Sequence, residues 1–490
     1  MTNELVLALD IGTTSAKAVL FELDGKLIVE AERMITTHYP EQGWAEQDVI
    51  EIELSSIGAI RDVVDKAKIK GDEPIALGIS CAMHSLICVD QNGLPLSQAL
   101  IWADGRSIEQ VKRLKTTNGN EVYARTGLPN HPMSPLSKLL WMKETNFNPY
   151  KQATYFMSVK EYILNRWFGC RVIDYSMAAA TGLFNMKTYD WDEEILLLCG
   201  VERNQLSKIV PPTEILTGLD SKVAQGMGIS NQIPFVIGAA DGQLANLGSG
   251  ATSPGEVAIS AGTSGAIRQM ITGSQVSENQ ETFCYAFTKN RSIIGGPTNN
   301  GGIVLQWIKD LLKFKGTIDE LINEAEQIDP GSEGLIFLPY INGERAPVWN
   351  QGAKGNFFGL TVEHKQEHII RAVLEGITFN LYHIGTILEQ QAGPSGKIYV
   401  NGGLARSSIW VQMLADVFGK DIYLSESHHS AAWGAAWTAL VAIGKANSFD
   451  EIKENILIDS IIKPDISRHE IYSKTFKKYK ELSLDMVKHF

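Results

Sequence analysis

The alternation of apolar and polar positions predicts strands and helices in both halves of the chain. Residues 5–9 form an apolar run, and residues 16–21 and 27–29 are rich in apolar and β-branched side chains, which predicts three strands joined by turns. Residues 50–68 and 368–390 carry apolar side chains at every third or fourth position, as amphipathic helices do. Strands that alternate with helices predict an α/β fold with mixed sheets.

The opening pattern recurs near the middle of the chain, which suggests a weak internal duplication. The second half opens with an apolar run at residues 235–240 that ends in Asp241. Residues 257–260 then lead into Gly-Thr-Ser-Gly at 262–265, much as the first strand leads into Gly-Thr-Thr-Ser at 12–15. We therefore expect two related lobes.

A stretch that breaks regular structure separates the two copies. Residues 245–255 are rich in Gly, Ser and Thr, and we predict domains that span residues 1–248 and 249–490. Each domain would carry one Gly/Thr/Ser turn, and the two turns would face each other across a cleft. We expect ligands to bind in that cleft.

Length and charge narrow the class of protein. With ~100–200 residues per domain, the 490 residues predict two or three domains. The 44 Lys and Arg residues are outnumbered by 56 Asp and Glu, which gives a net charge of −12 and no basic block, so nucleic acid is not an expected partner. The chain shows no long apolar run, no basic leader and no C-x-x-C spacing among its five cysteines. We expect a cytoplasmic protein without membrane attachment.

The first turn has the chemistry of a phosphate site. Asp10 ends a predicted strand, and the turn after it offers backbone N–H groups and three hydroxyls. Such a turn can hold phosphate oxygens, and the carboxylate can hold Mg²⁺ through water. The alternative is a hairpin whose hydroxyls satisfy only local backbone. Neither a P-loop motif nor a G-x-G-x-x-G after a strand occurs, so phosphate binding must be of another type.

Five motifs spread over the chain carry a more specific signal. They are residues 10–17, 133–141, 355–375, 400–406 and 431–436. In this order they resemble the phosphate loop, the two signatures, the adenosine-binding segment and the small-residue helix of the FGGY family of carbohydrate kinases. The resemblance implies a two-lobed actin/hexokinase-like (ribonuclease H-like) ATPase fold, with duplicated mixed-sheet domains around a central cleft.

The resemblance also implies ATP-dependent phosphoryl transfer, with Asp241 as the general base and Asp10 as the residue that binds Mg²⁺ through water. A carboxylate that projects from a strand end into a cleft can accept the proton of a sugar hydroxyl. Without the resemblance, Asp241 would be interpreted as part of an Asp-Gly turn that caps the next helix. The residues expected to contact ATP are Thr13, Thr14, Ser15, Lys17, Gly262, Thr263, Gly302, Gly402 and Gly403.

Other segments bear on the acceptor substrate. Residues expected from the resemblance to contact it are Met83, His84, Trp102, Asp104, Arg106, Asp241 and Gln243. For Asp104 and Arg106 the alternative is a structural ion pair. Residues 80–85, 130–138 and 174–182 are more similar to kinases of gluconate than to kinases of xylulose. The expected reaction is transfer of the ATP γ-phosphoryl to the terminal hydroxyl of D-gluconate to give 6-phospho-D-gluconate, and phosphorylation of the 5-hydroxyl of D-xylulose is the alternative.

A gluconate substrate brings a carboxylate that needs a cation or a helix N-terminus nearby. The candidates are Arg106, Arg125, His131 and Lys138. A sugar- and nucleotide-binding regulator without catalysis is a further alternative on the same fold, although Asp10 and Asp241 favour an enzyme. A homodimer is an expectation from the family alone.

Overall fold

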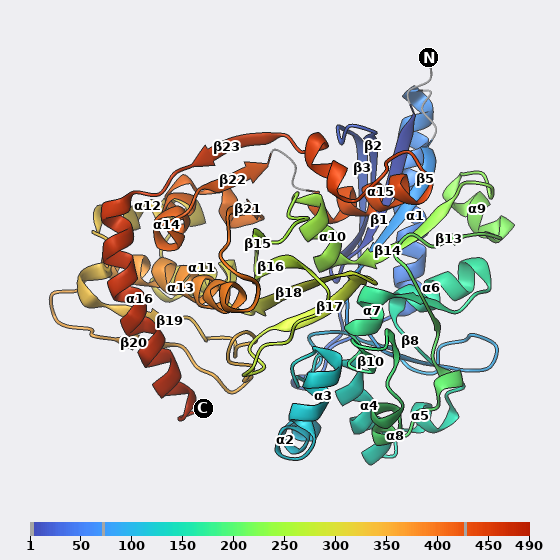
Figure 1. Ribbon diagram of the computed structural model, residues 1–490, viewed down its shortest axis with the longest axis horizontal. Coiled ribbons are helices and arrows are strands. Elements are labelled where there is room, and N and C mark those ends of the chain that lie inside the picture. Colours follow the sequence, from blue (N-terminus) through green and yellow to red (C-terminus); the bar gives the residue numbers. More distant parts are fainter. Residues whose placement is uncertain (1–3, 71–73, 426–428) are drawn as a thin grey trace.

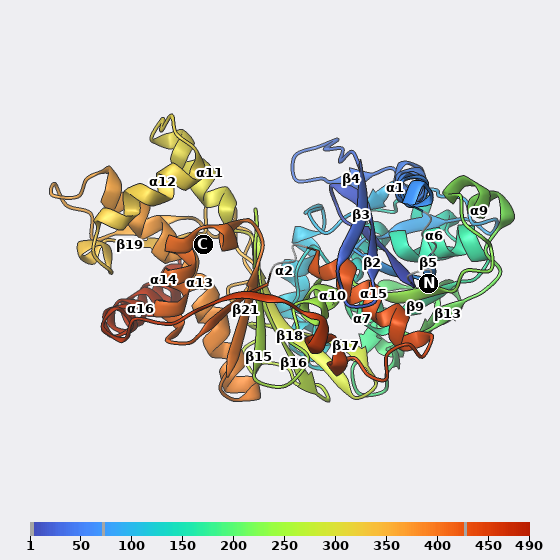
Figure 2. The same ribbon diagram turned by 90° about the horizontal axis from the view of Figure 1, so that it is seen from above.

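The computed structural model describes residues 4–70, 74–425 and 429–490, which form two lobes joined along the middle of the molecule (Figures 1 and 2). A six-stranded mixed sheet forms the centre of the first lobe. In spatial order its strands are β3 (Leu27–Met34), β2 (Ser15–Glu22), β1 (Leu5–Ile11), β5 (Pro74–Cys81), β14 (Phe235–Ala240) and β13 (Ile215–Leu216). The three strands predicted at the start of the chain are therefore confirmed.

A seven-stranded sheet forms the centre of the second lobe. Its strands are β17 (Phe283–Thr288), β18 (Arg291–Thr298), β16 (Gly265–Thr272), β15 (Glu256–Ala261), β21 (Lys397–Asn401), β22 (Ile422–Ser425) and β23 (Ile458–Ile462). The two sheets share one order of strand pairings. In the first sheet β3, β2 and β1 are antiparallel neighbours, β1, β5 and β14 are parallel neighbours, and β13 is antiparallel to β14. In the second sheet β18, β16 and β15 are antiparallel neighbours, β15, β21 and β22 are parallel neighbours, and β23 is antiparallel to β22. The second sheet adds β17 at its other edge.

This repeated pairing shows the duplication, with β15 and β16 in the places of β1 and β2. One part of the sequence prediction is wrong, because residues 235–240 do not open the second half. They form β14, which pairs in parallel with β5 and belongs to the first sheet. The apolar run is explained by burial, since every residue of β14 is buried.

Helices cover both faces of the first sheet. Alternate residues of β1 face opposite sides, so that Leu7 joins the core beneath α1 (Val49–Lys70) and Ala8 joins the core beneath α15 (Ser430–Ala442). Helix α15 contacts β5, β1 and β14, although it comes from the second half of the chain. The first lobe is thus completed by a helix that lies more than 180 residues beyond β14 in the sequence.

The contact between α15 and α10 (Asp241–Gly248) depends on glycine. A Cβ atom added to Gly434 of α15 would lie 2.1 Å from the carbonyl oxygen of Leu244. A Cβ added to Gly248 would lie 1.8 Å from the carbonyl oxygen of Ser430. The small-residue motif of the sequence therefore allows two helix backbones to touch directly behind the strand end that carries Asp241.

The remaining elements surround these sheets. Those of the first half are β4 (Glu46–Gln47), β6 (Ile87–Val89), β7 (Ala99–Leu100), α2 (Ile108–Thr116), α3 (Gly119–Thr126), α4 (Pro135–Glu144), α5 (Asn148–Gln152), β8 (Tyr155–Met157), α6 (Val159–Phe168), β9 (Val172–Asp174), α7 (Tyr175–Ala179), β10 (Phe184–Asn185), β11 (Asp190–Trp191), α8 (Glu193–Cys199), β12 (Lys208–Val210) and α9 (Ser221–Met227). Those of the second half are α11 (Gly302–Leu311), α12 (Ile318–Glu324), β19 (Ile336–Leu338), β20 (Asn356–Phe358), α13 (Gln366–Ala392), α14 (Ser408–Phe418) and α16 (Ile466–Val487). The helices predicted over residues 50–68 and 368–390 are confirmed as α1 and α13. Within the described ranges, no helix combines the length and the apolar character needed to cross a membrane.

Candidate active site

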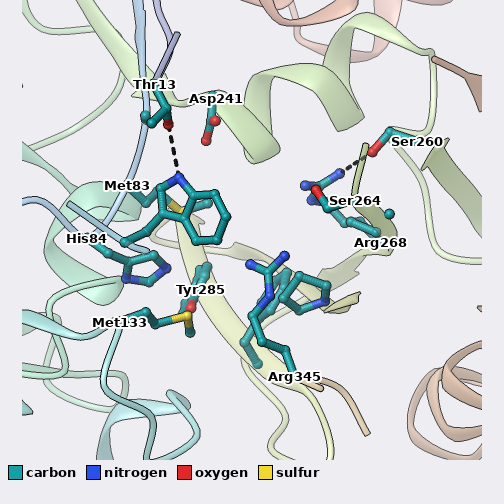
Figure 3. Close-up of a pocket in the computed structure, with 16 residues that line it drawn as sticks. Thr13, Met83, His84, Met133, Asp241, Ser260, Ser264, Arg268, Tyr285 and Arg345 are labelled. Atoms are coloured by element: carbon teal, nitrogen blue, oxygen red, sulfur yellow. Dashed lines mark hydrogen bonds between the residues drawn. The ribbon is translucent and has the colours of Figure 1, made fainter. Parts of the chain in front are cut away.

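A cavity of about 260 Å³ lies between the two lobes (Figure 3). It is lined by residues Thr13, Ala82, Met83, His84, Trp102, Met133 and Asp241 of the first half, and by Ser260, Ser264, Gly265, Ala266, Arg268, Phe283, Tyr285, Pro297 and Arg345 of the second half. The first phosphate turn, the second turn and Asp241 thus meet at one site. This is the cleft that the duplicated turns predict.

Asp241 enters the cavity from the end of β14, as the first residue of α10. Its carboxylate accepts a hydrogen bond of 2.7 Å from the backbone N–H of Gly242. Burial, and next the negative charge of Asp10, raise the pKa of Asp241 to about 6. A carboxylate with a pKa just below neutrality is ionised at pH 7 and is a stronger base than an ordinary aspartate, which suits proton abstraction.

A buried polar network holds the strand end that carries Asp241. Ser176 accepts a hydrogen bond of 2.8 Å from the backbone N–H of Ala240. The Ser176 hydroxyl in turn donates to Asp174, which also pairs with Lys160 at 2.7 Å. Segment 174–182, which the sequence relates to substrate class, therefore anchors the strand end next to Asp241.

Asp10 lies at the end of β1, where its carboxylate accepts a hydrogen bond of 2.7 Å from Ser80 Oγ. Burial raises the pKa of Asp10 as well. Asp10 is a suitable ligand for Mg²⁺, which usually takes one or two carboxylates and completes its shell with water and phosphate. No cluster of three or more His, Cys, Asp or Glu among the described residues could hold a metal by itself. The donor set therefore fits Mg²⁺ bound together with a phosphate ligand.

Each of the two Gly/Thr/Ser turns is closed by a hydrogen bond from the N–H of its first glycine, and the second turn is one residue shorter than the first. The N–H of Gly12 donates to the carbonyl of Ser15 at 2.9 Å, and the N–H of Gly262 donates to the carbonyl of Ser264 at 2.9 Å. Each turn joins an antiparallel strand pair, β1–β2 and β15–β16. Thr13 Oγ1 accepts a hydrogen bond of 2.9 Å from Trp102 Nε1, which ties the first turn to the wall of the cavity.

The other residues predicted to contact ATP lie on or beside these turns. Thr14 follows Thr13 in the first turn, and Thr263 lies in the second. Ser15 is buried and donates its hydroxyl to Glu32, and Lys17 lies 4.0 Å from the same carboxylate. The Ser15 hydroxyl therefore has a protein partner, and its contact with ATP stays a prediction.

Three predicted nucleotide-site glycines differ in what surrounds them. A Cβ on Gly302 would lie 2.9 Å from the carbonyl oxygen of Gly262, and a Cβ on Gly402, where φ is +97°, would lie 2.5 Å from that of Ala261. At these two positions the protein backbone itself requires glycine. A Cβ on Gly403 would have no atom within 4 Å, so space for a ligand is left beside that residue.

Met83, His84 and Trp102 line the cavity as the sequence predicts. His84 Nδ1 lies 2.8 Å from the carbonyl oxygen of Ala180, so this nitrogen carries the proton and donates it. Burial lowers the pKa of His84 to about 3, and the ring is neutral at pH 7. Its Nε2 is therefore a hydrogen-bond acceptor, suited to a substrate hydroxyl.

Asp104, Arg106 and Gln243 are not among the residues that line the cavity. Arg106 Nη2 pairs with Glu46 at 2.6 Å and with Asp104 at 2.8 Å, and its Cζ lies 3.8 Å from the centre of the Trp44 ring. This is the structural ion pair that stands as the alternative in the sequence. Gln243 is fully buried within α10.

Lys138 connects three segments that build the cavity. Its Nζ donates to the carbonyl oxygens of His84 (2.6 Å), Ile101 (2.8 Å) and Met133 (2.9 Å). His84 and Met133 line the cavity, and Ile101 precedes Trp102. Burial lowers the pKa of Lys138 to about 7. The lysine of the first family signature is thus a scaffold for the site, and its donors already have partners.

The other predicted cations do not face the cavity. Arg125 forms ion pairs with Glu121, Glu194 and Asp192. His131 is buried, and burial lowers its pKa well below its ordinary value, so the ring is neutral. No charged group of the predicted set is therefore placed to bind a substrate carboxylate.

Arg268 and Arg345 face the cavity, and sequence reasoning missed both (Figure 3). Arg268 lies on β16, three residues after the second turn, and Arg345 lies in the loop before a cis Ala346–Pro347 bond. Burial lowers the pKa of each guanidinium, that of Arg345 to about 10, which leaves both charged at pH 7. Only the position of Arg268 beside the second turn offered a signal in the sequence.

Comparison with known proteins gives the site a context. The N-terminal domain model of the FGGY family of carbohydrate kinases matches residues 5–248, and the C-terminal domain model matches residues 257–443. The chain is 42% identical over 489 residues to a gluconokinase of Bacillus licheniformis, which covers 97% of this chain and 94% of that protein.

Solved structures agree in fold. The crystal structure of gluconate kinase from Lactobacillus acidophilus matches with a TM-score of 0.96 and 33% identity, and covers 99% of this chain and 98% of the other. A ligand-bound xylulose kinase from Lactobacillus acidophilus gives the same values. The two family models together match most of the chain, and the cavity that both Gly/Thr/Ser turns and Asp241 reach lies between the two matched halves. This protein is therefore a member of the FGGY family of carbohydrate kinases.

Proposed function

We propose that this protein is a gluconokinase, which transfers the γ-phosphoryl group of ATP to the terminal hydroxyl of D-gluconate and releases 6-phospho-D-gluconate. The observation that carries the proposal is Asp241, an aspartate of raised pKa in a cavity flanked by both phosphate turns. The gluconokinase of Bacillus licheniformis, 42% identical over most of the chain, supports gluconate as the acceptor. D-xylulose is the second candidate, because the xylulose kinase structure matches equally well.

Three residues of the cavity have different roles in the proposed reaction. Asp241 accepts the proton of the terminal hydroxyl as that oxygen attacks the γ-phosphorus. His84 Nε2 accepts a hydrogen bond from a hydroxyl further along the substrate. Arg268, which lines the cavity beside the second turn, offsets negative charge on the transferred group.

Asp10 is the residue that would hold Mg²⁺, through water, which leaves Asp241 free to act as the base. The ion supplies positive charge to the phosphate oxygens when it is bound. The backbone N–H groups and hydroxyls of the turns at Gly12–Ser15 and Gly262–Ser264 bind the β- and γ-phosphates, and the open space beside Gly403 accommodates the nucleoside. A regulator without catalysis would have no use for a base of raised pKa, which is why we favour an enzyme.

We also infer a cytoplasmic location, because ATP is an intracellular substrate and all five cysteines are free thiols, four of them buried. A homodimer stays an expectation from the family. The structure describes one chain, and size-exclusion chromatography with light scattering would measure the assembly in solution.

The proposed function is tested by ADP release from ATP with Mg²⁺ and D-gluconate, D-xylulose, glycerol or L-ribulose as acceptor. The comparison is made as kcat/KM, because that ratio defines specificity. We expect the highest value with D-gluconate, and a ³¹P NMR spectrum that shows a phosphomonoester on a primary alcohol. A higher kcat/KM with D-xylulose would show that D-xylulose, and not D-gluconate, is the preferred acceptor. The proposed roles of Asp241 and of the two turns would be unchanged.

A further inference from the structure

Two arginines extend into one small cavity, and neither forms a salt bridge with another described residue. Arg268 Nη1 donates to Ser260 Oγ at 3.2 Å, and Arg345 Nη2 donates to the carbonyl oxygen of Thr298 at 3.3 Å. The Nε atom of each is buried and has no hydrogen-bond partner among the described residues. Arg345 Nη1 also has no hydrogen-bond partner among the described residues, and an unpartnered donor on a side chain that lines a cavity points to a ligand that completes it.

The two arginines lie at different ends of the cavity. A Cβ added to Gly242 would lie 2.9 Å from Arg268 Nε, so the Arg268 guanidinium packs against the residue next to the base. Figure 3 shows Arg268 on the side of Ser260 and Ser264, and Arg345 entering from the side opposite Asp241. Arg268 is therefore placed for the reacting end, and Arg345 for the far end of the substrate.

The length of the substrate connects these two ends. A six-carbon chain with carbon–carbon bonds of about 1.5 Å spans about 6 Å when extended. With the terminal hydroxyl at Asp241, the opposite carbon of a linear sugar acid, which carries the carboxylate, lies at the far end of the cavity. Resting on the proposed function, we propose that Arg345 binds the carboxylate of the substrate and makes the cavity selective for a polyhydroxy acid over a neutral polyol of the same length.

Neighbouring residues hold the Arg345 guanidinium in position at the cavity. Its neighbour Glu344 forms no salt bridge with it within the described part of the chain, because that buried carboxylate accepts hydrogen bonds from Thr298 Oγ1 (2.7 Å), Asn300 Nδ2 (3.0 Å) and Asn380 Nδ2 (3.0 Å). These bonds fix the loop that carries Arg345. The Arg345 Cζ atom lies 5.0 Å from the centre of the Trp102 ring, which supports the guanidinium from the first lobe.

Arg345 also retains the donors that a carboxylate needs. Only Nη2 has a hydrogen bond within the described part of the chain, and it goes to a carbonyl oxygen. Nη1 and the second N–H of Nη2 are left for an anion, and a planar guanidinium binds carboxylates through two parallel hydrogen bonds. The neighbouring His131 is neutral and adds no competing cation.

The test compares D-gluconate with D-gluconamide, which has the same carbon chain and hydroxyls but a neutral amide in place of the carboxylate. Arg345→Met, Arg345→Lys and, as the matched control at the other end of the cavity, Arg268→Met are assayed with both acceptors. We expect Arg345→Met to lower kcat/KM for gluconate by about 10²-fold, mainly through KM, because a buried carboxylate loses its partner. The loss with gluconamide should be less than about tenfold, and Arg345→Lys should recover part of the preference for gluconate.

The control should behave differently, because Arg268→Met is expected to lower kcat for gluconate and gluconamide alike. If Arg345→Met lowers kcat/KM equally for gluconate and gluconamide, the assignment of Arg345 is overturned. In that case turnover of gluconate by the wild type would still support the proposed function. Absence of gluconate turnover in the wild type would instead overturn the proposed function and the assignment with it. If Arg345→Met does not fold, the ratio of gluconate to gluconamide kcat/KM in Arg345→Lys decides, and an unchanged ratio overturns the assignment.

Discussion

Replacing Asp241 with Asn separates the chemistry of this carboxylate from its effect on stability. The pKa of Asp241 rises from an ordinary 3.8 to about 6, chiefly through burial and next through Asp10. A carboxyl whose pKa is raised on folding contributes stability below pH 3.8, and this contribution is lost as the pH rises through about 6. At pH 7 the wild type therefore holds an ionised group that the fold disfavours.

The size of this effect follows from the shift in pKa. A difference of about two pH units corresponds to about 3 kcal/mol, and the partial exposure of Asp241 to the cavity reduces this to about 1–2 kcal/mol through solvent screening. We therefore expect Asp241→Asn to be more stable than the wild type at pH 7, and to lose most of that gain at pH 4. Its kcat should nevertheless fall by roughly 10²–10⁴, the usual effect of losing a general base.

Both effects are measured on the same preparation. Coupled ADP release gives kcat, and thermal denaturation at pH 7 and pH 4 gives the change in midpoint. The control is Asp459→Asn, because Asp459 is exposed on β23 and its replacement should alter neither quantity. Turnover of Asp241→Asn within tenfold of the wild type would refute the base assignment, and a midpoint at pH 7 no higher than the wild type's would refute the electrostatic argument.

Further predictions concern the scaffold and the pH dependence. Gly434→Ala places a Cβ 2.1 Å from the carbonyl oxygen of Leu244 and should lower the free energy of unfolding by about 3 kcal/mol. Gly403→Ala adds a Cβ with no protein atom within 4 Å, so it should keep the wild-type thermal midpoint and raise KM for ATP. Lys138→Met leaves four carbonyl oxygens without this donor, so we expect a loss of about 2–3 kcal/mol in thermal or denaturant unfolding, together with a higher KM for the acceptor. Arg106→Met should lower the thermal midpoint without changing the gluconate-to-gluconamide ratio. The wild-type kcat/KM should decline below about pH 6, because Asp241 becomes protonated there; a profile flat to pH 5 would contradict this.

Local features of the sequence were sufficient for the phosphate turns. Each turn is a short loop within one hairpin, so its Gly, Thr and Ser residues and its flanking strands all come from about a dozen consecutive positions. The order of the five motifs identified the family, and the family implied Asp241 and the two-lobed fold. The duplication was visible for the same reason, since β15 and β16 repeat the local pattern of β1 and β2.

The assignment of β14 required long-range information. An apolar run followed by Asp-Gly is compatible with the start of a new domain and with the last strand of the old one. Pairing with β5, more than 150 residues earlier in the sequence, places β14 in the first sheet. The same holds for α15, whose contact with that sheet depends on glycine at both of the helix backbones that meet.

The sequence by itself determined the family and the position of the two turns, and it predicted Asp241 as the base, because these depend on residues that are close together or on a recognisable order of motifs. Only the tertiary structure decided which cations are available to a substrate. Arg106 and Lys138 are held by carboxylates or carbonyl oxygens from distant segments, and Arg345 reaches the cavity without a salt bridge among the described residues. A charged side chain can bind a ligand only where the fold has left its donors without partners, and that condition is set by contacts between segments far apart in the chain.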